Sequence, residues 1–128
     1  MNKIVIDATQ KKIFLTIIKS DSTHNISYEN SKTNYEKLMM LIQEFLAAKN
    51  LKIKDISSIY VNRGPGSYAG IRNSLSTVKA INLAKKIDYY SYSLSDFDDE
   101  NEVNNENIPN LCEKFKVKKN LINPIYLS

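Results

Sequence analysis

The chain has 128 residues, of which 42% are hydrophobic and 25% are charged. This is the length of one ordinary domain with enough apolar material for a core, which excludes a fibrous or wholly disordered chain. The formal net charge is +4. We interpret the excess as a lysine-rich solvated surface, because the sequence has no basic stripe with interleaved aromatic residues of the kind that binds nucleic acid.

The single cysteine, Cys112, excludes an internal disulfide bond and a cysteine-based metal cluster. No apolar run approaches the roughly 18 residues that a membrane-spanning helix requires. The first residues enter a strand-like pattern and show no signal-peptide architecture. We therefore expect a cytoplasmic protein that does not associate with a membrane.

Five strands and two helices are predicted from the periodicity of the apolar residues. Short runs rich in β-formers predict strands over residues 3–7, 12–19, 22–29, 56–61 and 89–93. Helical spacing predicts one helix over 34–50, with Asn50 as its stop, and a second over 69–86. The apolar faces of these helices carry Tyr35, Leu38, Leu41, Ile42 and Phe45 in the first and Ile71, Leu75, Val78 and Ile81 in the second.

The order of these elements is β-β-β-α-β-α-β, a three-stranded meander followed by crossovers to parallel strands. This is the order of an α/β ribonuclease H-like lobe, the building block of the actin-like ATPase superfamily. We expect the lobe to occupy residues 1–95 and residues 96–128 to form an acidic linker and a basic tail, with a short helix opened by Pro109. The charged residues of this tail are Asp96, Asp98, Asp99, Glu100, Glu102 and Glu106, followed by Lys114, Lys116, Lys118 and Lys119.

All three glycines and both arginines of the chain fall within one segment, which joins a predicted strand to a predicted helix. Its residues of interest are Arg63, Gly64, Pro65, Gly66, Ser67, Tyr68, Gly70 and Arg72. One interpretation is a rigid corner, in which glycine supplies unusual backbone angles and Ser67 caps the helix. The other is a phosphate cradle made of free helix amides and the two arginines. We favour the corner, because the pattern matches neither a P-loop nor a dinucleotide fingerprint.

The run Ile59-Tyr-Val-Asn-Arg-Gly-Pro-Gly-Ser-Tyr-Ala-Gly-Ile-Arg72 resembles the signature of the TsaB (YeaZ) family, which reads Gly-Pro-Gly-Ser-Phe-Thr-Gly-Leu-Arg. Tyr68 and Ala69 stand where the family has Phe and Thr, and Asp7-Ala8-Thr9 stands where it has Asp-Thr-Ser. The ending over 123–127 is similar to the family's Pro-x-Tyr ending. The family normally carries a second subdomain before that ending, and residues 96–119 are too few to supply it, so the chain resembles a shortened member.

The resemblance implies a non-catalytic scaffold in the synthesis of threonylcarbamoyladenosine in tRNA. TsaB proteins pair through helices of their N-terminal lobe with TsaD, the subunit that modifies an adenosine beside the anticodon. A TsaE-like ATPase is the further partner implied, a homodimer is possible for the chain alone, and tRNA is reached only indirectly. We expect no cofactor.

The outer faces of the two helices are candidates for a partner interface. Apolar and small residues there could form a docking patch, or they could be ordinary core margin and neutral surface. The resemblance to TsaB favours docking. The residues we expect at the interface are Met39, Met40, Gln43, Ala47, Ser76, Ala80, Leu83 and Ala84.

The sequence offers little for catalysis. His24 is the only histidine, and one histidine does not supply the pair that binds the metal of TsaD. Asp7 ends the first strand, where actin-like ATPases place a carboxylate associated with magnesium. Cys112 has no neighbouring base and is interpreted as an inert thiol. We therefore predict no catalytic or metal-binding residues, and the alternative is a small nucleotide-binding enzyme of the actin-like or glycoprotease-like type.

Overall fold

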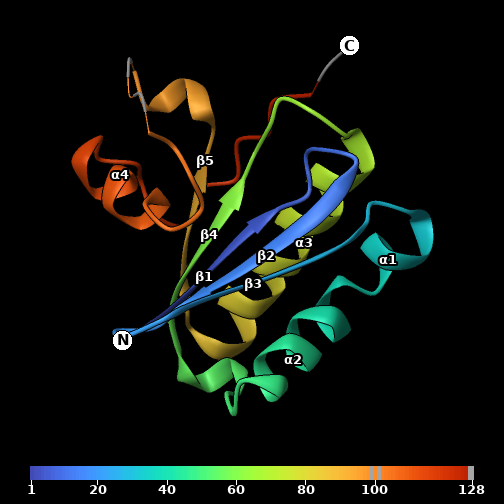
Figure 1. The fold of residues 1–128 in the computed structure, drawn as a ribbon. Coiled ribbons are helices and arrows are strands. Elements are labelled where there is room, and N and C mark those ends of the chain that lie inside the picture. Colours follow the sequence, from blue (N-terminus) through green and yellow to red (C-terminus); the bar gives the residue numbers. More distant parts are fainter. Residues whose placement is uncertain (99, 101, 127–128) are drawn as a thin grey trace.

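The computed structural model describes residues 1–98, 100 and 102–126 and contains one five-stranded sheet. The strand order is β3-β2-β1-β4-β5, in which β1 pairs antiparallel with β2 and parallel with β4. The strands β2 and β3 are also antiparallel, and β4 and β5 are parallel. The strands are β1 (Asn2–Asp7), β2 (Lys12–Ile18), β3 (Thr23–Glu29), β4 (Ile56–Asn62) and β5 (Asp88–Tyr92) (Figure 1).

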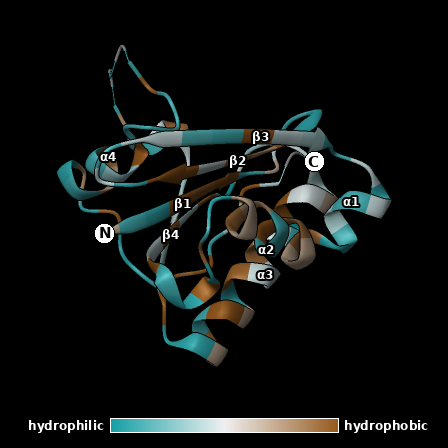
Figure 2. Cartoon of the chain, turned by 60° about the horizontal axis from the view of Figure 1, so that its bottom comes forward, coloured by the Kyte–Doolittle hydropathy of each residue, from teal (hydrophilic) through white to brown (hydrophobic). Residues whose placement is uncertain are grey.

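The alternation of side chains along the central strands divides the core between the two faces of the sheet. In β1, Ile4 and Ile6 belong to the larger core cluster, whereas Val5 belongs to a second one. Neighbouring side chains of a strand point to opposite faces, so both faces must be covered. Figure 2 shows the outermost strand β3 as largely hydrophilic, which agrees with its position at an edge of the sheet.

Three helices cover the face of the sheet that holds the larger core cluster (Figure 1). They are α1 (Lys32–Glu36), α2 (Leu38–Ala48) and α3 (Tyr68–Lys85). The prediction of one continuous helix over 34–50 is wrong, because two helices, α1 and α2, occupy this part of the chain. The helix starts at Lys32 and is interrupted at Lys37, where φ is −113° and ψ is 28°. The amide of Lys37 donates to Asn34 O at 3.2 Å, one residue short of the helical partner. The break lets α1 contact α3.

The predicted stop at Asn50 is confirmed. Asn50 adopts a left-handed conformation with φ of 60°. Its amide donates to Ala47 O at 3.0 Å, and the next amide, of Leu51, donates to Leu46 O at 2.9 Å. This pair of hydrogen bonds is a Schellman motif, which satisfies carbonyl groups left free at the end of a helix.

The opposite face of the sheet is covered by the C-terminal part of the chain. Helix α4 (Ile108–Lys114) places Ile108, Leu111 and Cys112 against a second cluster on this face, and Phe97 belongs to the same cluster. The predicted short helix is thus present. Lys114 forms an ion pair with Glu100, and Lys119 lies 3.5 Å from Asp88.

The boundary between a lobe of residues 1–95 and a tail of residues 96–128 stays a prediction. Of the predicted acidic residues, Asp99 lies outside the described residues, as do Leu127 and Ser128 of the tail. Within the described ranges, no helix has both the length and the hydropathy needed to cross a bilayer.

Candidate functional site

The glycine segment makes the corner between β4 and α3. Gly64 has a φ of +114°, in the region that favours glycine, and is followed by a cis peptide bond to Pro65. The amide of Gly64 donates to Asn62 Oδ1 at 2.9 Å, and the amide of Ser67 donates to Thr9 O at 2.8 Å. Ser67 is the N-cap of α3, and its hydroxyl accepts from the Gly70 amide at 3.2 Å. These contacts use amides inside the protein and favour the rigid corner over a phosphate cradle.

The first turn of α3 lies directly on the end of β1. A Cβ atom on Gly70 would be 2.0 Å from Ala8 O, and one on Gly66 would be 2.3 Å from Thr9 O. Only glycine permits so close an approach of two backbones. Tyr68 is exposed and packs on Tyr126, with ring centroids 4.6 Å apart. The corner therefore fixes the position of α3 against the sheet.

Arg63 connects the corner to the C-terminal segment. Its Nη2 donates to Asp96 Oδ1 at 2.8 Å, and its Nη1 donates to Asn123 O at 3.0 Å. Its backbone amide donates to Tyr92 O at 2.7 Å, and its carbonyl accepts from the Ile125 amide at 2.8 Å. Only 14% of the Arg63 side chain is exposed, and both terminal nitrogens of its guanidinium are engaged by structural partners. Arg72, in contrast, is exposed on α3.

Replacing Arg63 by Met should destabilise the protein by about 2–3 kcal/mol, because Asp96 and Asn123 O lose charge-assisted hydrogen bonds in a partly buried site. Arg72→Met is the matched control and should change the free energy of unfolding by less than about 0.5 kcal/mol. Urea denaturation of both variants measures this difference. Equal stabilities would show that the Arg63 contacts are energetically neutral.

Asp7 is buried at the end of β1 and serves the same corner. Its Oδ1 accepts from the Thr9 amide at 2.9 Å and from Thr9 Oγ1 at 2.6 Å, and its Oδ2 accepts from Asn62 Nδ2 at 3.2 Å. Asn62, which sequence reasoning missed, also accepts from the Gly64 amide and so links Asp7 to the glycine segment. Both carboxylate oxygens therefore order the turns around the corner.

The other titratable residues that we considered for catalysis lie apart from one another. His24 Nε2 is 3.2 Å from Ser22 Oγ on the β3 side of the sheet. Burial, and then the charge of Asp96, raise the pKa of Cys112 to about 12, so this thiol is protonated and inert at neutral pH. No group of three His, Cys, Asp or Glu side chains that could hold a metal ion occurs within the described part of the chain.

A groove runs between α1 and α2 on one side and α3 on the other. Three hollows form it, and neighbouring hollows share Met39 at one junction and Tyr35, Glu36, Asn73 and Ser76 at the other. We refer to these hollows together as the helix groove. Of the residues expected at a partner interface, the groove is lined by Met39, Gln43, Ala47, Ser76 and Ala80. Met40, Leu83 and Ala84 are exposed on the same helices but do not line it.

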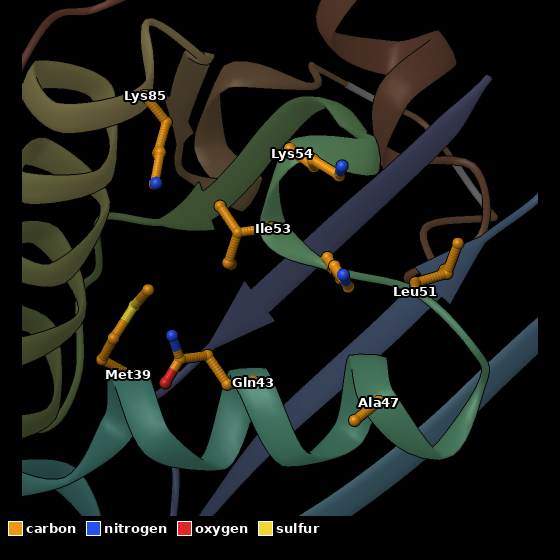
Figure 3. A pocket seen from close by; sticks show the side chains of 8 residues that line it. Met39, Gln43, Ala47, Leu51, Ile53, Lys54 and Lys85 are labelled. Atoms are coloured by element: carbon orange, nitrogen blue, oxygen red, sulfur yellow. The ribbon is translucent and has the colours of Figure 1, made fainter.

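The hollow that extends along α2 and reaches the C-terminal end of α3 has a volume of about 370 Å³. Figure 3 shows Met39 and Gln43 extending from α2 toward Ile53, with Lys85 entering the same space from α3. Leu51 and Ala47 complete the apolar lining, which is more extensive than the polar one. Lys52 and Lys54, which follow α2, lie at the rim and were not predicted as interface residues.

Known proteins resemble this chain in sequence and in fold. Residues 25–93, more than half of the chain, match the family model "TsaD: tRNA N6-adenosine threonylcarbamoyltransferase". The "tRNA threonylcarbamoyladenosine biosynthesis protein TsaB" of Buchnera aphidicola subsp. Schizaphis graminum is 23% identical over 90 residues, which are 70% of this chain and 43% of the relative. Its counterpart from Buchnera aphidicola subsp. Acyrthosiphon pisum is 24% identical, over 62% of this chain and 36% of the relative. The chain thus spans less than half the length of these curated relatives.

Two solved structures share the fold. YeaZ from Pseudomonas aeruginosa aligns with a TM-score of 0.66 and 14% identity, over 72% of this chain and 43% of that one. RuvC from Thermus thermophilus aligns with a TM-score of 0.53 and 11% identity, over 90% of this chain and 80% of that one. These likenesses confirm the predicted ribonuclease H-like fold. The curated relatives are TsaB proteins and one structural neighbour is a YeaZ protein, and the chain belongs to the family that the matching model describes.

Proposed function

We propose that this protein is a non-catalytic scaffold subunit in the synthesis of threonylcarbamoyladenosine in tRNA, and that it binds a TsaD-like subunit through the helix groove. A TsaE-like ATPase is a further partner in this proposal, and tRNA is reached through the TsaD-like subunit. The observation that carries the proposal is the groove itself, an open surface lined by five of the eight residues expected at the interface.

The chemistry of the groove suits a protein partner. Small side chains, Ala47 on α2 and Ser76 and Ala80 on α3, leave room for another helix to approach closely, and Met39 offers a flexible apolar contact. These residues lie within the part of the chain that the family model matches. The groove also depends on the glycine corner, because the corner sets the position of α3, which forms one wall of the groove.

The proposal of a non-catalytic role is supported by the engagement of the candidate catalytic groups. Asp7 accepts hydrogen bonds at both carboxylate oxygens, and Cys112 is buried among apolar side chains. The TsaB proteins named above are described as biosynthesis proteins of the same modification.

The experiment is co-purification with the TsaD-like subunit of the same organism, using two alanine-to-arginine variants. Ala80→Arg puts a long charged side chain into the groove and should lower the affinity by about tenfold or more. Ala48→Arg is the matched control, because Ala48 is exposed on α2 and does not line the groove. Both sites are exposed, so neither variant should alter folding.

Two results would contradict the proposal. The first is equal retention of the partner by the Ala80→Arg variant and the wild type. The second is ATP hydrolysis by the purified chain alone without any binding of the TsaD-like subunit, which would favour the alternative of a small nucleotide-binding enzyme.

A further inference from the structure

One end of the helix groove is an apolar hollow surrounded by positive charge. Its lining includes Met39, Leu51 and Ile53, of which Ile53 is almost fully buried. The charged residues that line it are three exposed lysines, Lys52, Lys54 and Lys85, and no acidic residue is among the lining residues (Figure 3). An apolar surface with a cationic rim is complementary to apolar side chains flanked by carboxylates.

The charge of these lysines is not neutralised inside the protein. Among the described residues, none of the three forms a salt bridge. The nearest carboxylate in sequence, that of Asp55, instead accepts from the Lys52 backbone amide at 2.8 Å and caps the turn over Ile53–Asp55. The ammonium groups are therefore available to an external partner.

The shape of the groove indicates a polypeptide segment as the occupant. The lysine-rimmed hollow continues through Met39 into the hollow beside Ala80, and from there through Ser76 to Tyr68 at the start of α3. Such an elongated surface between helices is the kind that receives an amphipathic helix. An RNA backbone would be attracted to the lysines but would leave the apolar lining uncovered.

The carboxylates of α1 and α2 do not line the lysine-rimmed hollow. The Oε1 atom of Glu36 lies 3.9 Å from Nζ of Lys32 in the same helix. Glu36 lines the groove only in the two hollows beyond Met39, and Glu44 lines none of the three. Carboxylates that neutralise the lysine-rimmed hollow must therefore come from a partner.

We propose that this lysine-rimmed hollow holds an amphipathic segment of the TsaD-like subunit, with an apolar side chain over Met39 and Ile53 and carboxylates beside Lys54 and Lys85. This inference rests on the proposed function and adds the chemistry by which the partner is recognised. It makes the association electrostatically steered, so that binding weakens as the salt concentration rises.

The test is a double charge reversal, Lys54→Glu with Lys85→Glu, in the full chain. Affinity for the TsaD-like subunit should fall by about tenfold or more at low salt, because like charges then face each other across the interface. The loss should shrink at high salt. The control is Lys116→Glu with Lys118→Glu, which changes the net charge equally but lies beside α4 on the opposite face of the sheet. The control should keep wild-type affinity.

A carbodiimide cross-link supplies an independent readout. Lys54 or Lys85 of the wild-type chain should become joined to an Asp or Glu of the TsaD-like subunit. This inference would be overturned if the Lys54→Glu, Lys85→Glu variant kept wild-type affinity, or if the control variant lost as much affinity. Either result would leave the proposed function in place. Absence of binding by the wild type at any salt concentration would overturn both.

Discussion

The Gly70→Ala variant is expected to lose about 3 kcal/mol or more of stability, a large effect for one methyl group. The new Cβ atom would lie 2.0 Å from Ala8 O and 2.8 Å from Asn30 Nδ2. Asn30 Nδ2 donates a hydrogen bond to Ala8 O at 2.9 Å. Relieving the clash would therefore require the backbone at Ala8 to move and this hydrogen bond to break. Alanine favours a helix over glycine by only about 1 kcal/mol, and the clash therefore decides the sign.

Thermal and urea unfolding measure this effect, and Ser76→Ala is the control on an exposed position of the same helix. The control should shift the free energy of unfolding by less than about 0.5 kcal/mol. Binding of the TsaD-like subunit by any folded Gly70→Ala protein should also fall, because α3 forms one wall of the helix groove. A variant as stable as the wild type would show that α3 can move away from β1 without cost.

The elements with strong periodicity were predictable from the sequence. The five strands begin and end within one residue of their predicted limits. Continuous apolar runs such as Ile4-Val5-Ile6 are typical of a strand buried on both faces, as β1 is. Helix α3 begins at Tyr68 and ends at Lys85, one residue before the predicted limits. These features depend on local sequence alone, which is why their type and order were predicted.

The features that were missed depend on residues distant in the chain. Arg63 donates hydrogen bonds to Asp96 and Asn123, which follow it by 33 and 60 residues. No local sequence pattern relates residues so far apart. The break at Lys37 lies within a continuous apolar pattern and reflects the contact of α1 with α3. The lysine rim combines Lys52 and Lys54 with Lys85 from another helix. Helical spacing identified the groove residues on α2 and α3, but only the fold brings the three lysines together.

A chain that ends at residue 95 is expected to be unfolded or aggregated, although the predicted lobe ends there. The truncation removes Phe97, Ile108 and Leu111, which are buried in the cluster on the second face of the sheet. Burial of each is worth about 1.5–3 kcal/mol. Their combined contribution, on the order of 5–9 kcal/mol, is comparable to the roughly 5–15 kcal/mol that a whole domain has in reserve.

The truncation also exposes surfaces that remain in the shortened chain. Val5, Tyr60 and Tyr92 would lose their cover on the second face. The edge of β5 would lose the segment that follows α4, where the Asn120 amide donates to Tyr89 O at 2.7 Å and Asn120 Oδ1 accepts from the Tyr89 amide at 3.0 Å. An uncovered apolar face beside an open strand edge favours aggregation.

Size-exclusion chromatography and circular dichroism of the two chains test this expectation, with Leu111→Asp in the full chain as a milder disruption of the same packing. Leu111→Asp puts a carboxylate into the second cluster and should cost about 3 kcal/mol or more, whereas Glu113→Ala on the exposed side of α4 should be neutral. A monomeric, cooperatively folded chain of residues 1–95 would establish the lobe as an independent domain. The expected failure would instead show that the C-terminal segment completes the core: its acidic part contributes Phe97 to the second face, and its helix closes the side of the sheet that α1, α2 and α3 leave open.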